Sequence, residues 1–351
     1  MAATNPGSEA EPATVMPENN TTLQDITIAE EGDIILVLED GKKRIKVLAA
    51  ILSFKSKVFK KMLGPHFLEG QTQRSSEQPQ EIQLPEDDAD AMVLMCQLLH
   101  SGGPGKERGH LREVAVMASL ADKYDCVYEV SFISETLLKR WAAAGGITYC
   151  RSLDWAPFAT TTLLLGLNHM FVQVTRHTVL GVSSSFSQMR NSDCVPLPIT
   201  VLLGLEEQRA AARNLLVDKM ATRTAGGTCQ VGGCNGVPSM STFERDIAHR
   251  LGSPHWPPVW DLQPLRGIFQ KLASQPDILV SHTFKCGHSN PPVVLNRVGL
   301  QAVVREVKES AYGMCPWCAR QDKLQSRCEH VHKLKKVPHG DPLRQLDGTT
   351  T

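Results

Sequence analysis

Cysteine and histidine residues gather in short-spaced pairs in the last third of the chain. One pair is Cys286 and His288, and another is Cys315 and Cys318, which form a Cys-x-x-Cys pattern. Zinc takes four thiolate or imidazole ligands in a tetrahedron, and ligands two to four positions apart reach one ion from a single turn. These four residues are therefore the first predicted ligand set for a structural zinc ion.

Two further pairs leave other ligand sets open. Cys328 and His332 follow closely enough to replace the pair at 286 and 288, and Cys229 and Cys234 lie upstream in a glycine-rich stretch. With Cys229 and Cys234 included, the chain offers ligands for two ions. In a chain with reduced cysteines this spacing favours metal over disulfides. Four protein ligands leave no position for water, so the predicted site is structural.

Motifs for catalysis are incomplete. Residues 181–185 (GVSSS) lack the last glycine of a nucleophile elbow, and the Gly-Lys pair at 105–106 lacks the leading glycine of a phosphate-binding loop. The sequence contains no His-Glu-x-x-His motif. We therefore predict no enzyme and no catalytic residues. The alternative left open is a zinc-dependent ligase, or a redox protein that uses Cys315 and Cys318.

Composition narrows the class of protein. The length of 351 residues is typical of about two domains, and 37 basic residues cancel 37 acidic ones, so a generally nucleic-acid-binding protein is not expected. Residues 1–20 show no signal peptide, and no apolar stretch reaches the roughly 20 residues of a membrane helix. We expect a protein of the cytoplasm or nucleus with no membrane contact.

The elements that must position these residues begin after an acidic segment. Residues 1–30 carry no Lys or Arg and predict a disordered leader. An apolar run at 34–38 predicts a strand, and Asp40-Gly41 predicts a hairpin to an alternating strand at 44–47. A third, brief strand is predicted at 81–84. The sequence thus predicts a small sheet close to the N-terminus.

Helices are predicted around and after this sheet. One helix is expected to be capped by Ser56 and another by Asp87 or Asp88. Further helical segments are predicted at 111–121, 127–141, 158–180, 198–220 and 262–273. Residues 142–225 are therefore expected to be helical, 226–335 to be a Cys/His-rich region, and 336–351 to be a flexible tail.

Several spaced motifs occur in one order along residues 31–141. They are Gly32-Asp33-Ile34-Ile35-Leu36-Val37, then Val47, Leu52, Ser56 and Phe59, then Ile82 and Leu84, then Ala121-Asp122-Lys123-Tyr124. This arrangement resembles the BTB/POZ domain, and the remainder resembles the C-terminal half of fungal BTB proteins. The resemblance implies an α+β fold, with a short sheet flanked by helical hairpins and a mainly helical C-terminal region.

The resemblance also implies a function. BTB/POZ domains are interaction modules, usually dimeric, that serve as substrate adaptors for cullin-3 ubiquitin ligases or as transcriptional co-repressor platforms. We therefore predict a self-associating protein and, in its concrete version, a cullin-3 adaptor. Transcriptional regulation is the alternative, for which the basic run at 333–336 is the only hint of a DNA-binding module.

Three residues are predicted to take part in these interactions. Asp33 matches an aspartate whose basic partner, in repressor-type members, stands where this sequence has Ala49. That departure weakens the repressor interpretation. Leu111 and Glu113 have the apolar-x-Glu form of cullin-binding members, about two residues early relative to Ala121.

Overall fold

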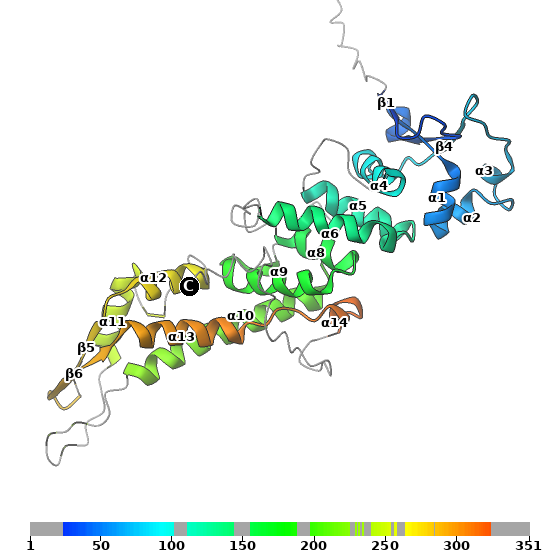
Figure 1. Ribbon diagram of the computed structural model, residues 1–351. Coiled ribbons are helices and arrows are strands. Elements are labelled where there is room, and N and C mark those ends of the chain that lie inside the picture. The colour runs from blue at the N-terminus through cyan, green and yellow to red at the C-terminus, as the bar shows by residue number, and fades with distance from the viewer. Residues whose placement is uncertain are drawn as a thin grey trace, which may run out of the picture.

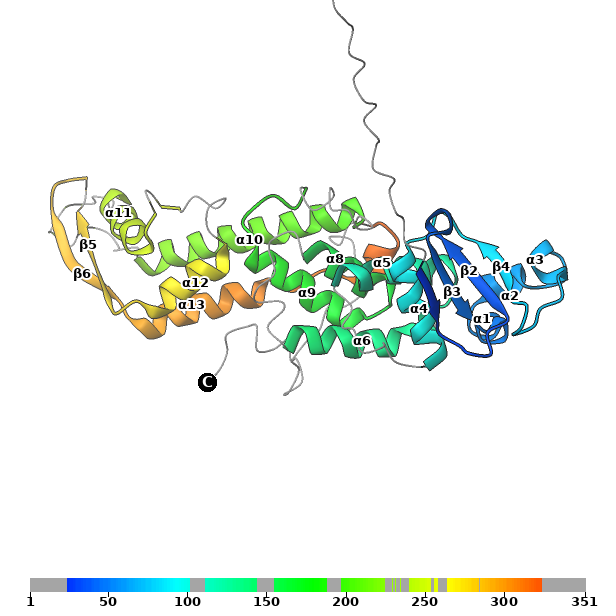
Figure 2. The same ribbon diagram turned by 90° about the horizontal axis from the view of Figure 1, so that it is seen from above.

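The computed structural model describes residues 24–101, 111–143, 155–187, 197–224, 229, 231, 234, 240–253, 256–257, 264–283 and 285–323. A small sheet lies at one end of an elongated molecule, a two-stranded hairpin lies at the other, and helices fill the space between them (Figure 1, Figure 2). The fold is α+β close to the N-terminus and mainly helical beyond it, as the sequence predicts.

Four strands form the N-terminal sheet: β1 (Gln24–Thr27), β2 (Ile34–Leu38), β3 (Lys43–Val47) and β4 (Gln80–Gln83). Their spatial order is β1-β3-β2-β4. Strands β2 and β3 pair antiparallel, and each outer strand runs parallel to its neighbour. The short turn η1 (Glu39–Gly41) joins β2 to β3, with Gly41 at a φ of 91° that suits glycine. This turn confirms the predicted hairpin.

Strand β1 lies inside residues 1–30, for which composition predicts a disordered leader. That prediction is wrong for the strand, and residues 1–23 lie outside the described residues. Strand β1 runs parallel to β3 along its whole length, and Asp25 faces Arg44 at 3.4 Å. The acidic composition could not reveal the strand because its pairing partner comes later in the chain.

Helices pack around this sheet: α1 (Ala49–Lys55), α2 (Lys57–Met62), α3 (Leu68–Gln71), α4 (Ala89–Ser101), α5 (Leu111–Lys123) and α6 (Val127–Ala143). The hydroxyl of Ser56 accepts the backbone N–H of Phe59 at 3.0 Å and caps α2 as predicted. At α4, the carboxylate of Asp88 accepts the N–H of Ala91 at 2.9 Å. Both caps pair N–H groups that a helix start leaves without a helical partner.

Residues that the family resemblance groups together meet in the core beside α2 and α5. The Phe59 and Tyr124 rings stack with centroids 4.4 Å apart, and the Ser56 hydroxyl donates to the carbonyl of Tyr124 at 2.5 Å. Buried Asp87 accepts the Tyr124 hydroxyl and pairs with Lys123 at 2.7 Å. Because a buried carboxylate is costly without partners, these contacts tie the start of α4 to the end of α5.

The C-terminal region contains α8 (Trp155–Leu164), α9 (Asn168–Gly181), α10 (Ile199–Thr224), α11 (Met240–Leu251), α12 (Leu265–Ser274), α13 (Arg297–Ser310) and α14 (Pro316–Arg320). Helices α10 and α12 confirm the predicted segments at 198–220 and 262–273. The single segment predicted at 158–180 is instead two helices. Between them, Gly166 adopts a φ of 71°, which ends α8 and lets the chain turn.

Helix packing connects the two regions. Helix α5 contacts α4 and α6 on the N-terminal side and α8 on the other, while α9 contacts α8, α10 and α12. Helix α13 lies against α10 and α12 (Figure 1, Figure 2). Buried hydrophobic residues form one connected cluster from Ile34 to Ala319, so the sheet and the helical region share a continuous core.

Strands β5 (Ile278–Thr283) and β6 (Ser289–Leu295) form an antiparallel hairpin of their own. Helix α11 contacts β5, and α10 contacts β6. The sequence analysis did not predict this hairpin, and Pro291 and Pro292 within β6 are unusual residues for a strand. Across the described residues, no helix has both the length and the apolar character to cross a membrane.

Candidate metal centre and interaction surface

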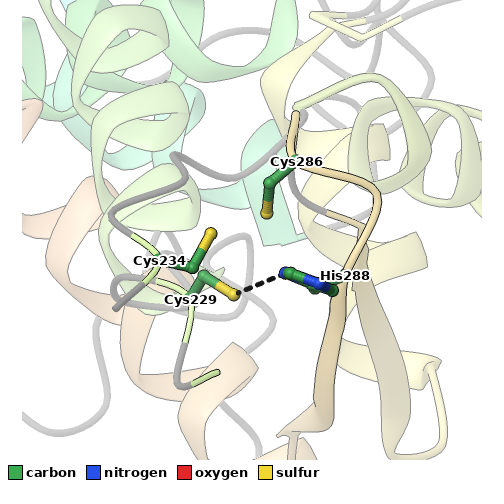
Figure 3. A group of neighbouring side chains, drawn as sticks. All are labelled: Cys229, Cys234, Cys286 and His288. Atoms are coloured by element: carbon green, nitrogen blue, oxygen red, sulfur yellow. Dashed lines mark hydrogen bonds between the residues drawn. The ribbon is translucent and has the colours of Figure 1, made fainter. Parts of the chain in front are cut away.

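Four side chains converge on one point at the hairpin end of the molecule. Cys229 and Cys234 come from the connection between α10 and α11, and Cys286 and His288 come from the turn between β5 and β6 (Figure 3). Their sulfur and nitrogen ligand atoms all lie within 4.8 Å of one another. Cys229 is buried and Cys234 is half-buried, whereas Cys286 and His288 are exposed. We call these four residues the CCCH cluster.

Local backbone geometry aims these side chains. Gly287, between the two hairpin ligands, has a φ of 85°, a conformation that residues with a side chain rarely adopt. On the other segment, the backbone N–H of Cys234 donates to the carbonyl of Val231 at 3.0 Å. The hairpin pair is therefore presented by a tight turn, and a hydrogen bond fixes the backbone at Cys234.

Hydrogen bonds already link the two segments. The Sγ atom of Cys229 lies 3.6 Å from Nδ1 of His288 (Figure 3). The backbone N–H of His288 donates to the sulfur of Cys286 and is the largest cause that lowers the pKa of Cys286 from 9.0 to about 7. Side-chain hydrogen bonds with Cys234, Cys229 and His288 lower this pKa further. The cluster thus favours the thiolate, which is the metal-binding form of cysteine.

The first predicted ligand set is not assembled by the structure. Cys315 and Cys318 lie at the start of α14, which contacts α8 and α9, and both views place α14 far from the β5–β6 hairpin (Figure 1, Figure 2). Among the described residues, the group close enough to share an ion contains Cys286 and His288 but neither of these cysteines. The alternates Cys229 and Cys234 take their place. Sequence spacing identifies the pairs, but only the topology decides which pairs meet.

The remaining candidates are the alternate ligands Cys328 and His332 and the predicted redox pair Cys315 and Cys318. Cys328 and His332 lie outside the described residues. Cys315 is fully buried and Cys318 is 6% exposed. A redox role needs an accessible thiolate, so the burial of this Cys-x-x-Cys pair does not favour the redox alternative.

Asp33, predicted as an interaction residue, forms a hydrogen bond with the backbone of α1. Its carboxylate accepts the backbone N–H of Ala49 at 2.7 Å, which is the first residue of α1. The two positions that the family resemblance links as a charged pair are therefore neighbours in space. With alanine in place of a basic residue, Asp33 pairs with the helix backbone instead of a side chain.

Leu111 and Glu113, the other predicted interaction residues, lie in the first turn of α5. Leu111 is partly buried against the hydrophobic core, and Glu113 is half-buried. Helix α5 is packed between α4, α6 and α8. The role of Leu111 and Glu113 in binding stays a prediction.

A cluster of exposed aromatic rings marks another surface near the sheet. Phe54 at the end of α1 is 87% exposed, and on α6 Tyr128 and Phe132, one turn apart, are 87% and 78% exposed. We call these three residues the aromatic face. Phe54 and Tyr128 also line a groove of about 740 Å³ that is bordered by Lys57 and Lys60 and by the turn between α8 and α9. Sequence analysis missed this face because helical periodicity does not show which apolar residues stay exposed in the fold.

A hairpin signal in the sequence surrounds Cys286 and His288. Apolar residues at 278–280 and 293–295 flank Cys286-Gly287-His288, and a glycine between two short runs is typical of a turn. This would have placed Cys286 and His288 in one hairpin turn. The pairing of that turn with the connection between α10 and α11 has no local signal, because it depends on how distant helices pack.

Comparison with models of known protein families gives one match. Residues 27–139 match the family described as BTB/POZ domain. The match includes β2 to β4, all of α1 to α5 and most of α6. A search of curated proteins finds no match. The BTB/POZ resemblance is confirmed, whereas the likeness to fungal proteins stays a prediction.

Proposed function

We propose, on the premise that residues 27–139 are a BTB/POZ domain, that this protein is a non-enzymatic, self-associating interaction platform. BTB/POZ domains support protein–protein interaction, and we propose a specific surface through which this domain binds a second copy of the chain. The observation that carries it is the aromatic face, where three large rings are exposed beside a groove.

Exposed aromatic rings are suited to binding a protein surface. Tyr and Phe are enriched at interface centres, and burying such a ring stabilises a complex through a large apolar area with few rotatable bonds. Tyr128 and Phe132 present two rings on one side of α6, and Phe54 adds a third from α1. A second copy of the chain that covered this face would bury all three rings.

The cullin-3 adaptor is the more specific version of this proposal. Its support is the family resemblance and the position of Leu111 and Glu113 at the start of α5. Binding of the cullin-3 scaffold is tested by a pull-down in which a known adaptor serves as the positive control. Capture of cullin-3 by the wild type and its loss in Glu113→Ala supports the adaptor role. No capture under conditions where the known adaptor binds contradicts it.

Self-association is tested by light scattering over a dilution series of the full chain. We expect a mass of two chains for the wild type and a shift towards one chain in the Phe54→Ala, Tyr128→Ala double variant. Leu68→Ala is the matched control, because Leu68 is an 81% exposed apolar residue of α3 outside the aromatic face. A wild-type mass of one chain at every concentration, or an equal shift in the Leu68 variant, contradicts the proposal.

A catalytic role receives no support from the described chemistry. The four residues of the CCCH cluster fill a tetrahedral ligand set, so the cluster offers no position for an activated water. The only other short-spaced cysteine pair among the described residues of the C-terminal region is buried at α14. The C-terminal region is therefore proposed as a second recognition or spacing module attached to the BTB/POZ domain.

A further inference from the structure

We propose that Cys229, Cys234, Cys286 and His288 hold one structural zinc ion that fastens the connection between α10 and α11 to the β5–β6 hairpin. The proposal is independent of self-association through the BTB/POZ domain, because the cluster lies at the opposite end of the molecule (Figure 1). It rests on the distances, the donor chemistry and the backbone geometry of the cluster.

The distances suit a shared zinc ion. Zinc–sulfur bonds of about 2.3 Å and zinc–nitrogen bonds of about 2.0 Å, set at a tetrahedral angle, separate a sulfur and a nitrogen ligand by roughly 3.5 Å. The Sγ atom of Cys229 lies 3.6 Å from Nδ1 of His288. All four ligand atoms lie within 4.8 Å of one another, so small movements of the exposed side chains bring the remaining pairs to ligand distance.

The donor set selects the metal. Three thiols and one imidazole are soft or borderline ligands, which suit zinc and do not suit calcium or magnesium, whose ligands are oxygens. Four protein ligands close the coordination sphere, and a closed site of this type is structural. The two exposed members, Cys286 and His288, lie on the outside of the cluster, from which an ion can enter.

Backbone geometry prepares the site before metal binds. Gly287 adopts its positive φ between Cys286 and His288, and a Cβ atom there would meet no atom within 4 Å. The glycine therefore serves the conformation of the turn and not a close packing contact. The N–H of His288 already points at the sulfur of Cys286. Such N–H groups stabilise a metal-bound thiolate and orient it.

A bound zinc ion would stabilise the β5–β6 hairpin. Strands β5 and β6 pair only with each other among the described residues, and an isolated two-stranded hairpin is at best marginally stable in water. Helices α10 and α11 cover the strands, but the turn at 285–288 is exposed. A zinc ion bound to this turn and to the cysteines beyond α10 would join segments that are far apart in sequence.

The test is the zinc content of the native full chain, purified without added chelator and without a histidine tag. Mass spectrometry of metals is expected to show that Cys286→Ser and Cys234→Ser each lose one zinc ion per chain relative to the wild type. His249→Asn is the matched control, because His249 is an exposed histidine of neighbouring α11 outside the cluster, and it should keep the wild-type content. The Cys315→Ser, Cys318→Ser variant should keep the zinc of the CCCH cluster.

Two results overturn the proposal: a wild-type chain without zinc, or a zinc content that the Cys286 and Cys234 variants leave unchanged. If these variants do not fold, X-ray absorption of the zinc-loaded wild type decides. Three sulfurs and one nitrogen around zinc support the CCCH cluster. A first shell dominated by oxygen overturns it.

Discussion

The Sγ atom of Cys229 lies 3.6 Å from Nδ1 of His288, although 59 positions separate the two residues in the chain. This contact joins the connection after α10 to the turn of the β5–β6 hairpin. Because each segment contributes a second ligand to the same point, Cys234 on one side and Cys286 on the other, the contact belongs to a cluster of four side chains and not to an isolated hydrogen bond. The hairpin end of the molecule therefore contains a contact between distant segments that does not involve the residues of the hydrophobic core.

Removing zinc should loosen the hairpin and leave the N-terminal sheet unchanged. Without the proposed ion, the turn at 285–288 loses its link to the cysteines beyond α10, so the backbone of β5 and β6 should open more often. Hydrogen-exchange mass spectrometry of the full chain with and without a zinc chelator measures this. Faster exchange is expected at 278–295, and residues 34–47 serve as the internal control. Equal exchange with and without chelator at 278–295 contradicts the prediction.

Replacing Gly287 by alanine should weaken zinc binding without removing a ligand. An alanine at a φ of 85° costs about 1 kcal/mol, which corresponds to roughly fivefold weaker affinity. Competition against a chromophoric chelator measures the affinity. Gly181→Ala is the control, because a Cβ atom there also meets nothing within 4 Å and Gly181 has no positive φ. The same affinity in wild type and Gly287→Ala would count against a prepared turn.

Removing the carboxylate of Asp33 should lower stability. Its contact with the N–H of Ala49 pairs a group at the start of α1, so Asp33→Ala should lower the free energy of unfolding by about 1 kcal/mol. Asp33→Asn keeps an acceptor oxygen and should lose less. Urea unfolding measures both. An Asp33→Ala variant with wild-type stability but without self-association would instead assign Asp33 to binding.

His100 should make stability fall in mild acid. Its Nε2 accepts the N–H of Leu48 at 3.1 Å and its Nδ1 lies 2.9 Å from the carbonyl of Cys96, so the bound ring is neutral. Burial, followed by the nearby charge of Lys55, lowers the pKa of His100 below its ordinary value of 6.5. The unfolded chain therefore takes up a proton as the pH falls through about 6.5, while the folded chain does not.

The free energy of unfolding should consequently decrease as the pH falls from about 7 towards 5, and less steeply in His100→Gln. Urea titrations at several pH values measure the two slopes. His66→Gln, which removes an exposed histidine, controls for the loss of a histidine elsewhere. Parallel slopes in wild type and His100→Gln would show that His100 does not contribute.

Truncation of two phenylalanines five positions apart should lower the free energy of unfolding by very different amounts. Phe59 is fully buried against Tyr124, so Phe59→Ala should cost about 3–5 kcal/mol. Phe54 is 87% exposed, so at concentrations where the protein is a single chain Phe54→Ala should change the free energy of unfolding by at most about 0.5 kcal/mol. Thermal unfolding measures both. A large loss for Phe54→Ala would mean that the isolated chain already buries this ring, against its placement on the aromatic face.

Local chemistry determined much of the N-terminal region. The hairpin at Gly41 and the cap at Ser56 depend on neighbours within a few residues, so spacing alone predicts them. The order of motifs between 31 and 141 likewise predicted the BTB/POZ domain. The same reasoning failed for β1, which among the described residues pairs only with β3, a strand that comes later in the chain, and for β6, where Pro291 and Pro292 are unusual in a strand.

For the candidate metal centre, the sequence determined the ligand types and their short-range pairs, since these depend on a few consecutive residues. Tertiary structure alone decided that Cys286 and His288 meet Cys229 and Cys234, while Cys315 and Cys318 are buried at α14. The reason is physical. A pair of ligands is set by one turn, but the meeting of two pairs is set by the packing of α10, α11 and α13 over distances that no sequence spacing encodes.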